Sequence, residues 1–379
     1  MTDLPEISRR ALLAAGVAAA AALAGCTPKK TGQAEPTTTG PTGAATAPTA
    51  SSSAPTAPPA TTGSASGTSS ATTDPTAGKP PVDPASVKAN ELGMVPVMMY
   101  HRITPKVLGE FDTTPADFRA QLQRMFAAGY RPVRTIDLVR GDLRVAAGYT
   151  PAVFTFDDGY PDQFAMSGSG EIDPQSAVGI MLAVCREFPD CAPAGSFNIN
   201  RNPFGLSDPA TQHAGLTKLH ELGFEIANHT FHHDNLGLLD PAATQKDFVE
   251  LQQLVEAAVP GATVRTMALP FGVHPHVKAL AHTGSWQGEA YVNEGVLEVG
   301  ANPSHSPYSI RFDPLSIPRI RGTSWQGGNV PLTAKYWLDY LDHNKSQRYV
   351  SAGNPGHVTI PKSMRQYVTK SYAAKVITY

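Results

Sequence analysis

The sequence has little charge imbalance and few cysteines. Its 30 Lys and Arg residues are matched by 32 Asp and Glu residues, which leaves a net charge of −2. Because this balance gives no basic surface field, nucleic acid is not an expected partner. The three cysteines lie at positions 26, 185 and 191, so the chain has room for at most one internal disulfide. No internal repeat is visible.

The N-terminal apolar run, Ala11–Ala24, is too short and too rich in alanine for a membrane-spanning helix. It follows Ser8-Arg9-Arg10 and leads into Leu23-Ala24-Gly25-Cys26, which is the order of an export signal. The last four residues resemble a bacterial lipobox, and the paired arginines partly match a twin-arginine signal. We predict a lipoprotein signal peptide at 1–26 and a protein exported and anchored by lipid on Cys26 to the outer face of the cell membrane. An ordinary signal peptide with a chance cysteine is the alternative.

Residues 27–90 lack large apolar side chains and consist mostly of Thr, Ser, Ala, Pro and Gly. Such a segment cannot bury enough surface to offset the entropy of ordering, so we expect a disordered tether that its prolines keep extended. The remaining residues, 91–379, are enough for one large catalytic domain of barrel size.

Apolar strand patterns alternate with amphipathic helix patterns along 91–379. Each strand pattern ends in polar residues, which is typical of an α/β fold, a (β/α) barrel with its site at the C-terminal strand ends. The segment Tyr349–Tyr379 has no clear pattern. We expect strands at 94–101, 152–156, 195–199, 224–227, 264–269, 296–300 and 315–320, and helices at 114–129, 175–188, 217–222, 240–259 and 335–342.

One strand pattern ends in two adjacent carboxylates, in Thr155-Phe156-Asp157-Asp158-Gly159. Two like charges side by side resist joint ionisation unless a cation or a buried proton gives the two carboxylates different roles. We therefore expect one carboxylate to bind a metal and the other to move a proton.

Imidazoles that can complete a metal site follow in Asn228-His229-Thr230-Phe231-His232-His233. His229 and His233 are four residues apart and can face a common point, which with Asp158 gives two histidines and one carboxylate. Zinc fits this set, although other divalent metals do too. His232 is a competing ligand, and a solvated histidine-rich turn is the alternative for the whole stretch.

Together these two stretches resemble the first two motifs of the polysaccharide deacetylases, the NodB-homology family (carbohydrate esterase family 4). The resemblance runs from about Val95 to Arg321. It implies a barrel with fewer strands or helices than the eightfold ideal and metal-dependent removal of N-acetyl groups from sugars. It also implies that Asp157 is the general base and that the metal ligands are Asp158, His229 and His233, since the second motif is His-Ser/Thr-two residues-His.

The third motif departs from the family pattern, because Ala268-Leu269-Pro270-Phe271-Gly272 stands where Arg-Pro-Pro-Tyr-Gly is usual. The arginine that orients the base is missing, while the backbone N–H at Phe271 can still serve as an oxyanion donor beside Pro270. We expect Arg319 or Arg321 to replace the lost guanidinium.

The family's last motif, an apolar strand ending in Leu-x-x-His-Asp, is missing from the C-terminal region. Val97-Met98-Met99-Tyr100-His101 has the same form at the start of the domain, and the first and last strands of a barrel are neighbours. This order, and the missing third-motif arginine, resemble the permuted poly-N-acetylglucosamine deacetylase branch. His101 is thus the expected general acid, with a core histidine as the alternative and His305 and His357 as weaker candidates.

Several other side chains are candidates for lesser roles. Tyr160 and Asp162 follow the first motif and are expected to line the entrance of the site. Cys185 and Cys191 form either a disulfide or two reduced thiols. The aromatic candidates for stacking on sugar rings, which are otherwise core residues, are Trp286, Tyr291, Trp325 and Trp337.

The predicted function is removal of N-acetyl groups from an amino-sugar polymer, a polysaccharide that contains N-acetylglucosamine or peptidoglycan, by a metal-dependent hydrolase that uses zinc. A hydrolase of another amide or of an O-acetyl ester is the enzymatic alternative. The non-enzymatic alternative is a carbohydrate-binding lipoprotein whose site has decayed, which the missing arginine favours.

Overall fold

The computed structural model describes residues 82–324 and 330–379. The folded part begins before residue 91, because Pro84–Val87 forms helix α2, Ala89 is buried, and Asn90 forms a β-bridge with Val350. The last residues of the predicted tether are therefore part of the fold. The predicted signal peptide, Cys26 and the rest of the tether lie outside the described residues. Within the described ranges, no helix has the length and apolar character needed to cross a membrane.

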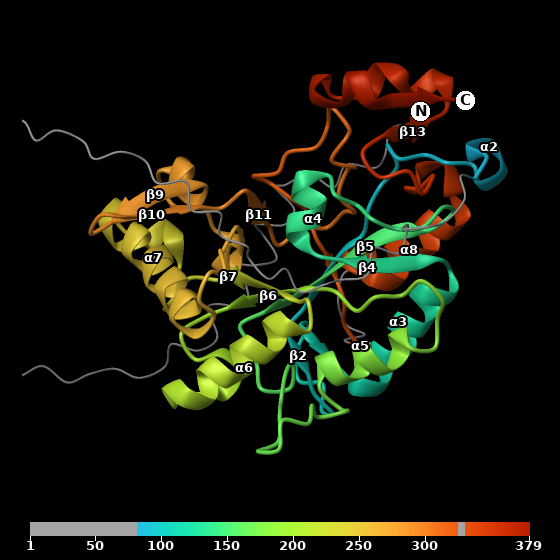
Figure 1. The fold of residues 1–379 in the computed structure, drawn as a ribbon. Helices are drawn as coiled ribbons and strands as arrows, with labels where there is room; N and C mark the ends of the chain where they lie inside the picture. The colour runs from blue at the N-terminus through green and yellow to red at the C-terminus, as the bar shows by residue number, and fades with distance from the viewer. Residues whose placement is uncertain (1–81, 325–329) are drawn as a thin grey trace, which may run out of the picture. The chain divides into compact units, whose positions relative to one another are not determined.

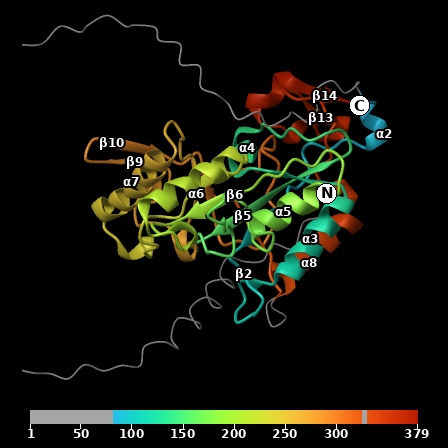
Figure 2. The ribbon, with the colours of Figure 1, turned by 60° about the horizontal axis from the view of Figure 1, so that its bottom comes forward.

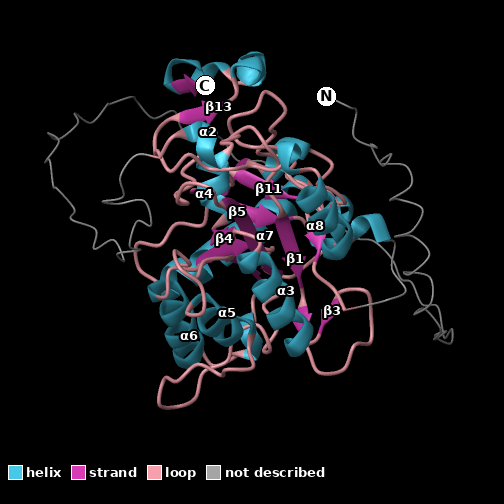
Figure 3. Ribbon diagram, turned by 90° about the vertical axis from the view of Figure 1, so that its right-hand side faces the viewer, coloured by secondary structure: helices cyan, strands magenta, loops and turns pink. Residues whose placement is uncertain are grey.

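A curled parallel sheet forms the centre of the domain, and helices surround it (Figures 1 and 3). The strand order is β11-β8-β7-β6-β5-β1-β12, and β4 pairs with the first half of β5. These pairs are all parallel, so every C-terminal strand end reaches the same edge. The strands are β1 (Val97–Tyr100), β4 (Tyr130–Val133), β5 (Thr150–Asp157), β6 (Ser196–Ile199), β7 (Glu225–Asn228), β8 (Thr266–Ala268), β11 (Gly295–Leu297) and β12 (Ile320–Arg321).

The helices lie against the outside of this sheet (Figure 2). Their apolar side chains join those of the strands in the core. In α3 the Thr114 hydroxyl caps the first turn by accepting from the Asp117 N–H at 3.0 Å, and Pro115 occupies the first helical position, as the sequence predicts. Asp240 caps α7 in the same way. The helices are α3 (Pro115–Ala127), α4 (Thr135–Arg140), α5 (Ala177–Cys185), α6 (Pro209–Glu221), α7 (Pro241–Ala258) and α8 (Ala334–His343).

The two edges of the sheet are joined by an irregular segment, 314–319. Its Ile317 exchanges backbone hydrogen bonds with β11, and it then enters β12, which pairs with β1. The predicted strand at 315–320 is wrong for most of its length, since only Ile320 falls in a regular strand. Pro314 and Pro318 explain this, because proline donates no backbone hydrogen bond to a ladder. The predicted (β/α) barrel is confirmed in a distorted form.

Other elements differ from the sequence-based prediction. Strand β4 and helix α4 lie in a connection for which no element was expected, and α6 starts eight residues before the predicted helix at 217–222. A hairpin of β9 (Thr283–Trp286) and β10 (Glu289–Val292) packs on α7 through the rings of Tyr291 and Phe248. The C-terminal segment holds the 3₁₀ helices Lys362–Tyr367 and Lys370–Lys375 and lies beside α2 (Figure 1). The remaining short strands are β2 (Arg102–Ile103), β3 (Asp112–Thr113), β13 (Val358–Ile360) and β14 (Val376–Thr378).

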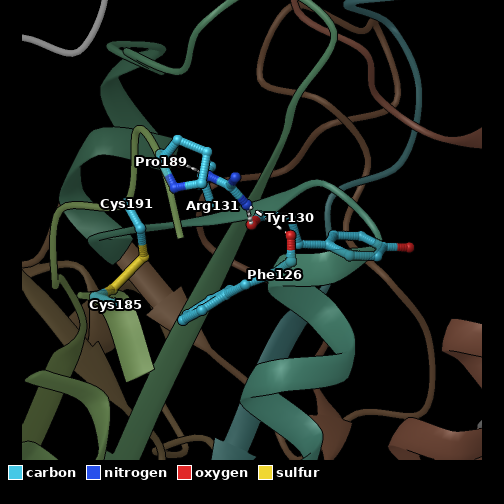
Figure 4. Close-up of a disulfide and its surroundings, with 6 residues drawn as sticks. All are labelled: Phe126, Tyr130, Arg131, Cys185, Pro189 and Cys191. Carbon is cyan, nitrogen blue, oxygen red and sulfur yellow. Dashed lines mark hydrogen bonds between the residues drawn. A yellow bond between two sulfur atoms is a disulfide. The ribbon is translucent and has the colours of Figure 1, made fainter. Parts of the chain in front are cut away.

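A disulfide joins Cys185, the last residue of α5, to Cys191 (Figure 4). It decides between the two alternatives that the sequence leaves open. The loop it encloses is held to β4 by the buried Arg131, whose guanidinium donates to the Pro189 carbonyl at 3.1 Å and to the Phe126 carbonyl at 2.9 Å. The bridge and this arginine together fix the connection from α5 to β6.

Replacing both Cys185 and Cys191 with serine should lower the free energy of unfolding by about 2 kcal/mol, because the bridge restricts the unfolded chain and a short closed loop restricts it only modestly. Urea unfolding with and without a reductant measures this difference. The reductant should destabilise the wild type and leave the double variant unchanged. Equal unfolding curves for both proteins in the absence of reductant would contradict a bridge that contributes to stability.

Candidate metal and catalytic site

The C-terminal edge of the sheet gathers the predicted residues from strands β1, β5, β7 and β8, with β6 between β5 and β7. Tyr100 of β1 is paired with Phe156 of β5, so His101 and Asp157 follow at the same level. His229 comes directly after β7, and Ala268 ends the adjacent β8. Pairing of parallel strands, rather than closeness in sequence, brings the site together.

Asp158, His229 and His233 point their polar atoms at one another. Oδ1 of Asp158 lies 3.3 Å from Nε2 of His229 and 3.1 Å from Nε2 of His233. Burial raises the pKa of Asp158, but the two imidazoles outweigh it and hold that pKa well below its usual range. Burial likewise lowers the pKa of His229, and the contact with Asp158 outweighs it and raises that pKa. Without a bound ion, the carboxylate and the two imidazoles therefore favour one another's charged forms.

The chemistry of these donors fits a divalent metal. Nδ1 of His229 lies 2.9 Å from the Ala268 carbonyl and donates to it in the matching tautomer, which leaves Nε2 with a lone pair. The three ligand atoms lie within 4.8 Å of one another. Two imidazoles and one carboxylate suit zinc and leave open positions for water and substrate.

The backbone that carries these ligands is held in unusual conformations. The backbones of four residues have positive φ values between 57° and 73°, which residues other than glycine rarely adopt: Asp158, Thr230, His233 and Phe271. Two local bonds enforce the turn after β7: the Thr230 N–H donates to Oδ1 of Asn228 at 2.7 Å, and the His233 N–H donates to Oγ1 of Thr230 at 3.0 Å. Strain of this kind gathers at functional sites.

The same turn separates the two competing histidines. His233 is turned back toward Asp158, whereas His232 faces away and contacts Asp247, with its Nδ1 2.7 Å from the Asp247 Oδ1. The structure therefore places His233 in the cluster with Asp158, and His232 outside it.

Asp157 is buried and held on one side only. Its Oδ1 accepts from Nη1 of Arg319 at 2.7 Å and from Nδ2 of Asn198 at 2.8 Å. Its Oδ2 faces Nε2 of His101 at 3.8 Å. Burial raises the pKa of Asp157, but Arg319, His229 and His101 outweigh it and lower that pKa to about 2. The carboxylate is thus ionised at neutral pH, with one oxygen fixed and the other directed toward His101.

Arg319 supplies a guanidinium contact to Asp157 from the segment before β12. Its side chain is fully buried, and its Nε donates to the Glu298 carbonyl at 2.7 Å, which anchors it to the end of β11. Arg321 instead pairs with Glu110 and covers the Phe111 ring. Of the two arginines considered from the sequence, only Arg319 contacts Asp157.

His101 is mostly buried and lies against the Phe111 ring. Burial lowers its pKa below the usual histidine value even though Asp157 and Asp158 oppose this. When protonated, such an imidazole is a stronger proton donor than a free one. Gln163 fixes its backbone, because Nε2 of Gln163 donates to the carbonyls of both His101 and Asp157. His357 lines a separate small pocket with Glu91 and Asp142. Among the described residues, neither His357 nor His305 forms a hydrogen bond or an ion pair with Asp157.

The rim of the site is formed by the predicted loop residues. Phe271 follows Pro270 in a 3₁₀ turn and is 62% exposed as a residue, and its ring lies edge-on to the His233 ring with the centroids 4.7 Å apart. Tyr160 lies beside Asp158, and burial together with that charge raises its pKa to about 12. Asp162 is half-buried, and burial raises its pKa.

Of the aromatic candidates for sugar stacking, two are wrong. Trp337 and Tyr291 are each only 2% exposed and belong to the core. Trp286 lies half-buried in β9, and Trp325 lies outside the described residues.

Two site residues were missed from the sequence. Asn198 lies opposite Asp157 in the pairing of β5 with β6, and Gln163 is fully buried below the first motif. Asn198 is a polar residue between Phe197 and Ile199 in an otherwise apolar strand, and this interruption could have marked it as a site residue. Gln163 had none.

Comparison with known proteins gives one family match. Residues 146–283 match the family model of the polysaccharide deacetylases, which confirms the recognition of that family from the two motifs. The matched range contains Asp157, Asp158, His229, His233 and Phe271, whereas His101 and Arg319 lie outside it. A search of curated proteins finds no match. Residues 146–283 are thus similar to the polysaccharide deacetylases, and the likeness to the permuted branch stays a prediction.

Several solved structures align with part of the chain. A polysaccharide deacetylase from Bacillus cereus is 18% identical, with 60% of this chain and 64% of that one covered and a TM-score of 0.44. The deacetylase PplD of Streptococcus pyogenes, in complex with acetate, is 17% identical over 60% and 92% of the two chains, with a TM-score of 0.44. IcaB from Ammonifex degensii is 16% identical over 61% and 93%, with a TM-score of 0.41. The chain thus spans less than two thirds of the first structure.

Arg319→Gln should destabilise the metal-free protein by about 3–5 kcal/mol at neutral pH, because it leaves the buried Asp157 charge without its cation. Since the folded pKa of Asp157, about 2, lies below the ordinary value of 3.8, the stabilisation is present above about pH 4 and is lost as the pH falls toward 2. The difference between wild type and variant should therefore shrink over that interval.

Urea unfolding in the presence of a chelator, repeated along a pH series, measures this difference. Arg321→Gln is the matched control, because its partner Glu110 is 43% exposed, and it should cost only about 0–1 kcal/mol. Equal losses for the two variants would show that Arg319 does not compensate a buried charge.

Proposed function

We propose that this protein is a metal-dependent hydrolase that removes N-acetyl groups from an amino-sugar polymer. The observation that carries the proposal is the separation of roles within the double aspartate. Asp157 is braced by Arg319 and directed toward His101, while Asp158 faces two imidazoles. A general base beside a single metal-binding site is an arrangement suited to the hydrolysis of an unreactive amide.

Asp158, His229 and His233 would hold the metal, and zinc is the proposed ion. When bound, the metal would polarise the acetamide carbonyl and lower the pKa of water. The tautomer fixed by the Ala268 carbonyl would keep Nε2 of His229 available to it.

The remaining steps fall to side chains of this chain. Oδ2 of Asp157 would accept the proton of the attacking water, since Oδ1 is already occupied by Arg319 and Asn198. The Phe271 N–H and its neighbour Pro270 would lie against the substrate carbonyl, with Phe271 offering an exposed ring to the sugar. His101, made more acidic by burial, would protonate the amine as acetate leaves.

The location of the activity is part of the proposal. The lipobox-like Leu23-Ala24-Gly25-Cys26 supports an exported protein that is lipid-anchored through Cys26 to the outer face of the cell membrane. The polymer would then be one of the cell surface, a polysaccharide containing N-acetylglucosamine or peptidoglycan. The Arg319–Asp157 pair favours catalysis over a decayed carbohydrate-binding site, because it restores the contact that Ala268 cannot make.

Acetate release should occur from N-acetylglucosamine oligomers or peptidoglycan fragments, should stop on chelation, and should return with zinc. The measurement compares these substrates with an O-acetyl ester of similar size. Faster release from the ester would favour the alternative hydrolase, and binding of oligomers without acetate release would favour the carbohydrate-binding lipoprotein.

Asp157→Asn and Asp158→Asn should separate the two carboxylate roles. The first should lower kcat by at least about 100-fold, the usual scale of a general base, and retain bound zinc. The second should lose zinc from this cluster because it removes a ligand. Turnover and zinc content are measured on the same samples. Full activity of Asp157→Asn would exclude Asp157 as the base.

A further inference from the structure

A second group of potential metal ligands lies outside the cluster of Asp158, His229 and His233. His232, Asp247 and Glu250 each offer a ligand atom, and these atoms lie within 4.8 Å of one another. His232 comes from the turn after β7, and the two carboxylates come from one face of α7, which packs beside β7 (Figure 1). Residues three apart on a helix are neighbours, so both carboxylates face the same point.

Two carboxylate oxygens in this group are buried without a hydrogen-bond donor. Among the residues that the structure describes, no side chain or backbone N–H donates to Oδ2 of Asp247 or to Oε2 of Glu250. Asp247 as a residue is only 3% exposed. A buried carboxylate oxygen without a partner is costly, and such an atom is usually satisfied by a donor or a cation.

The partners that are present leave this need unmet. His232 donates its backbone N–H to Oδ1 of Asp247 at 3.0 Å, and its ring Nδ1 lies 2.7 Å from the same oxygen. Lys246 lies 3.6 Å from the other oxygen of Glu250, Oε1, and is half exposed. The His232 ring is 38% exposed, which gives an ion a path from solvent.

We propose that His232, Asp247 and Glu250 form a second divalent-cation site. Two carboxylates and one imidazole suit a divalent ion such as zinc or manganese, with water filling the remaining positions. The ligand set does not include any residue of the first cluster, so the second site can fill independently of it.

The second site would brace the turn that carries a ligand of the first. The backbone of that turn already contacts α7, because the Phe231 N–H donates to the Asp247 carbonyl and Nδ2 of Asn228 donates to the Phe248 carbonyl. An ion shared by His232 and α7 would add a link directly beside His233. It is thus a positioning site for the loop rather than a site of chemistry.

Counting zinc equivalents on the metal-depleted full-length chain tests the proposal, with isothermal titration and elemental analysis as the readouts. Wild type should bind two equivalents, and Glu250→Gln should bind one. Glu256→Gln is the matched control, because Glu256 is exposed on the same helix, and it should bind two. His232→Asn should lose the same single equivalent while its backbone bond to Asp247 remains.

The Asp158→Asn background isolates the second site. Asp158→Asn should retain one equivalent, with a rise in Tm on adding zinc, and Asp158→Asn with Glu250→Gln should show neither. One equivalent in both wild type and Glu250→Gln, or none in Asp158→Asn, would overturn the proposal. Because the readouts are metal content and Tm, these outcomes do not depend on whether the deacetylase function is correct.

Discussion

The bond between Arg319 and Asp157 is the contact on which the rest of the site depends. A buried carboxylate beside a second carboxylate would ordinarily take up a proton, and a protonated Asp157 could not act as a base. The guanidinium prevents this by supplying a positive charge at 2.7 Å in a place that excludes water. It also occupies Oδ1, so that only Oδ2 faces the side from which His101 approaches.

The distortion of the barrel is what makes this contact possible. Arg319 lies in the irregular segment between β11 and β12, where two prolines interrupt regular strand pairing. From there its side chain reaches Thr155 and Asp157 of β5, and its Nε is tied to the end of β11. The segment that joins the two edges of the sheet therefore also carries the charge that the third motif lacks. Ala268, in turn, contributes only a carbonyl, which accepts from His229.

Much of the site could be predicted from the sequence, because its chemistry is concentrated in short motifs. Asp157, Asp158, His229 and His233 have recognisable spacing, and strand ends in a parallel barrel meet at one edge. His101 can be placed in the site because the first and last strands of a barrel lie side by side. The structure confirms this arrangement, since β1 pairs with β12 on one side and with β5 on the other.

What could not be predicted depends on long-range geometry. The choice between Arg319 and Arg321 depends on which side chain points toward Asp157 from the segment that leads from β11 into β12. Both arginines fit the alternating pattern there, so the sequence does not distinguish them. Gln163 acts on two carbonyls through its side chain, a role without a motif. Strand β4 was hidden because its pattern, Tyr130-Arg131-Pro132-Val133, contains a buried arginine, and the carbonyls of Phe126 and Pro189 that satisfy it are brought to it by the fold.

The central claim is that Arg319 keeps Asp157 ionised, and the carboxyl carbon of Asp157 reports this directly by NMR. In the metal-free wild type, followed from pH 7 to pH 4, that carbon should remain at its ionised chemical shift throughout. In Arg319→Gln, the largest of the charges that oppose burial is removed, so the pKa of Asp157 should rise and the carbon should titrate within this interval. Titration of the wild type within the same interval, or an Asp157 that stays ionised in Arg319→Gln, would contradict the account.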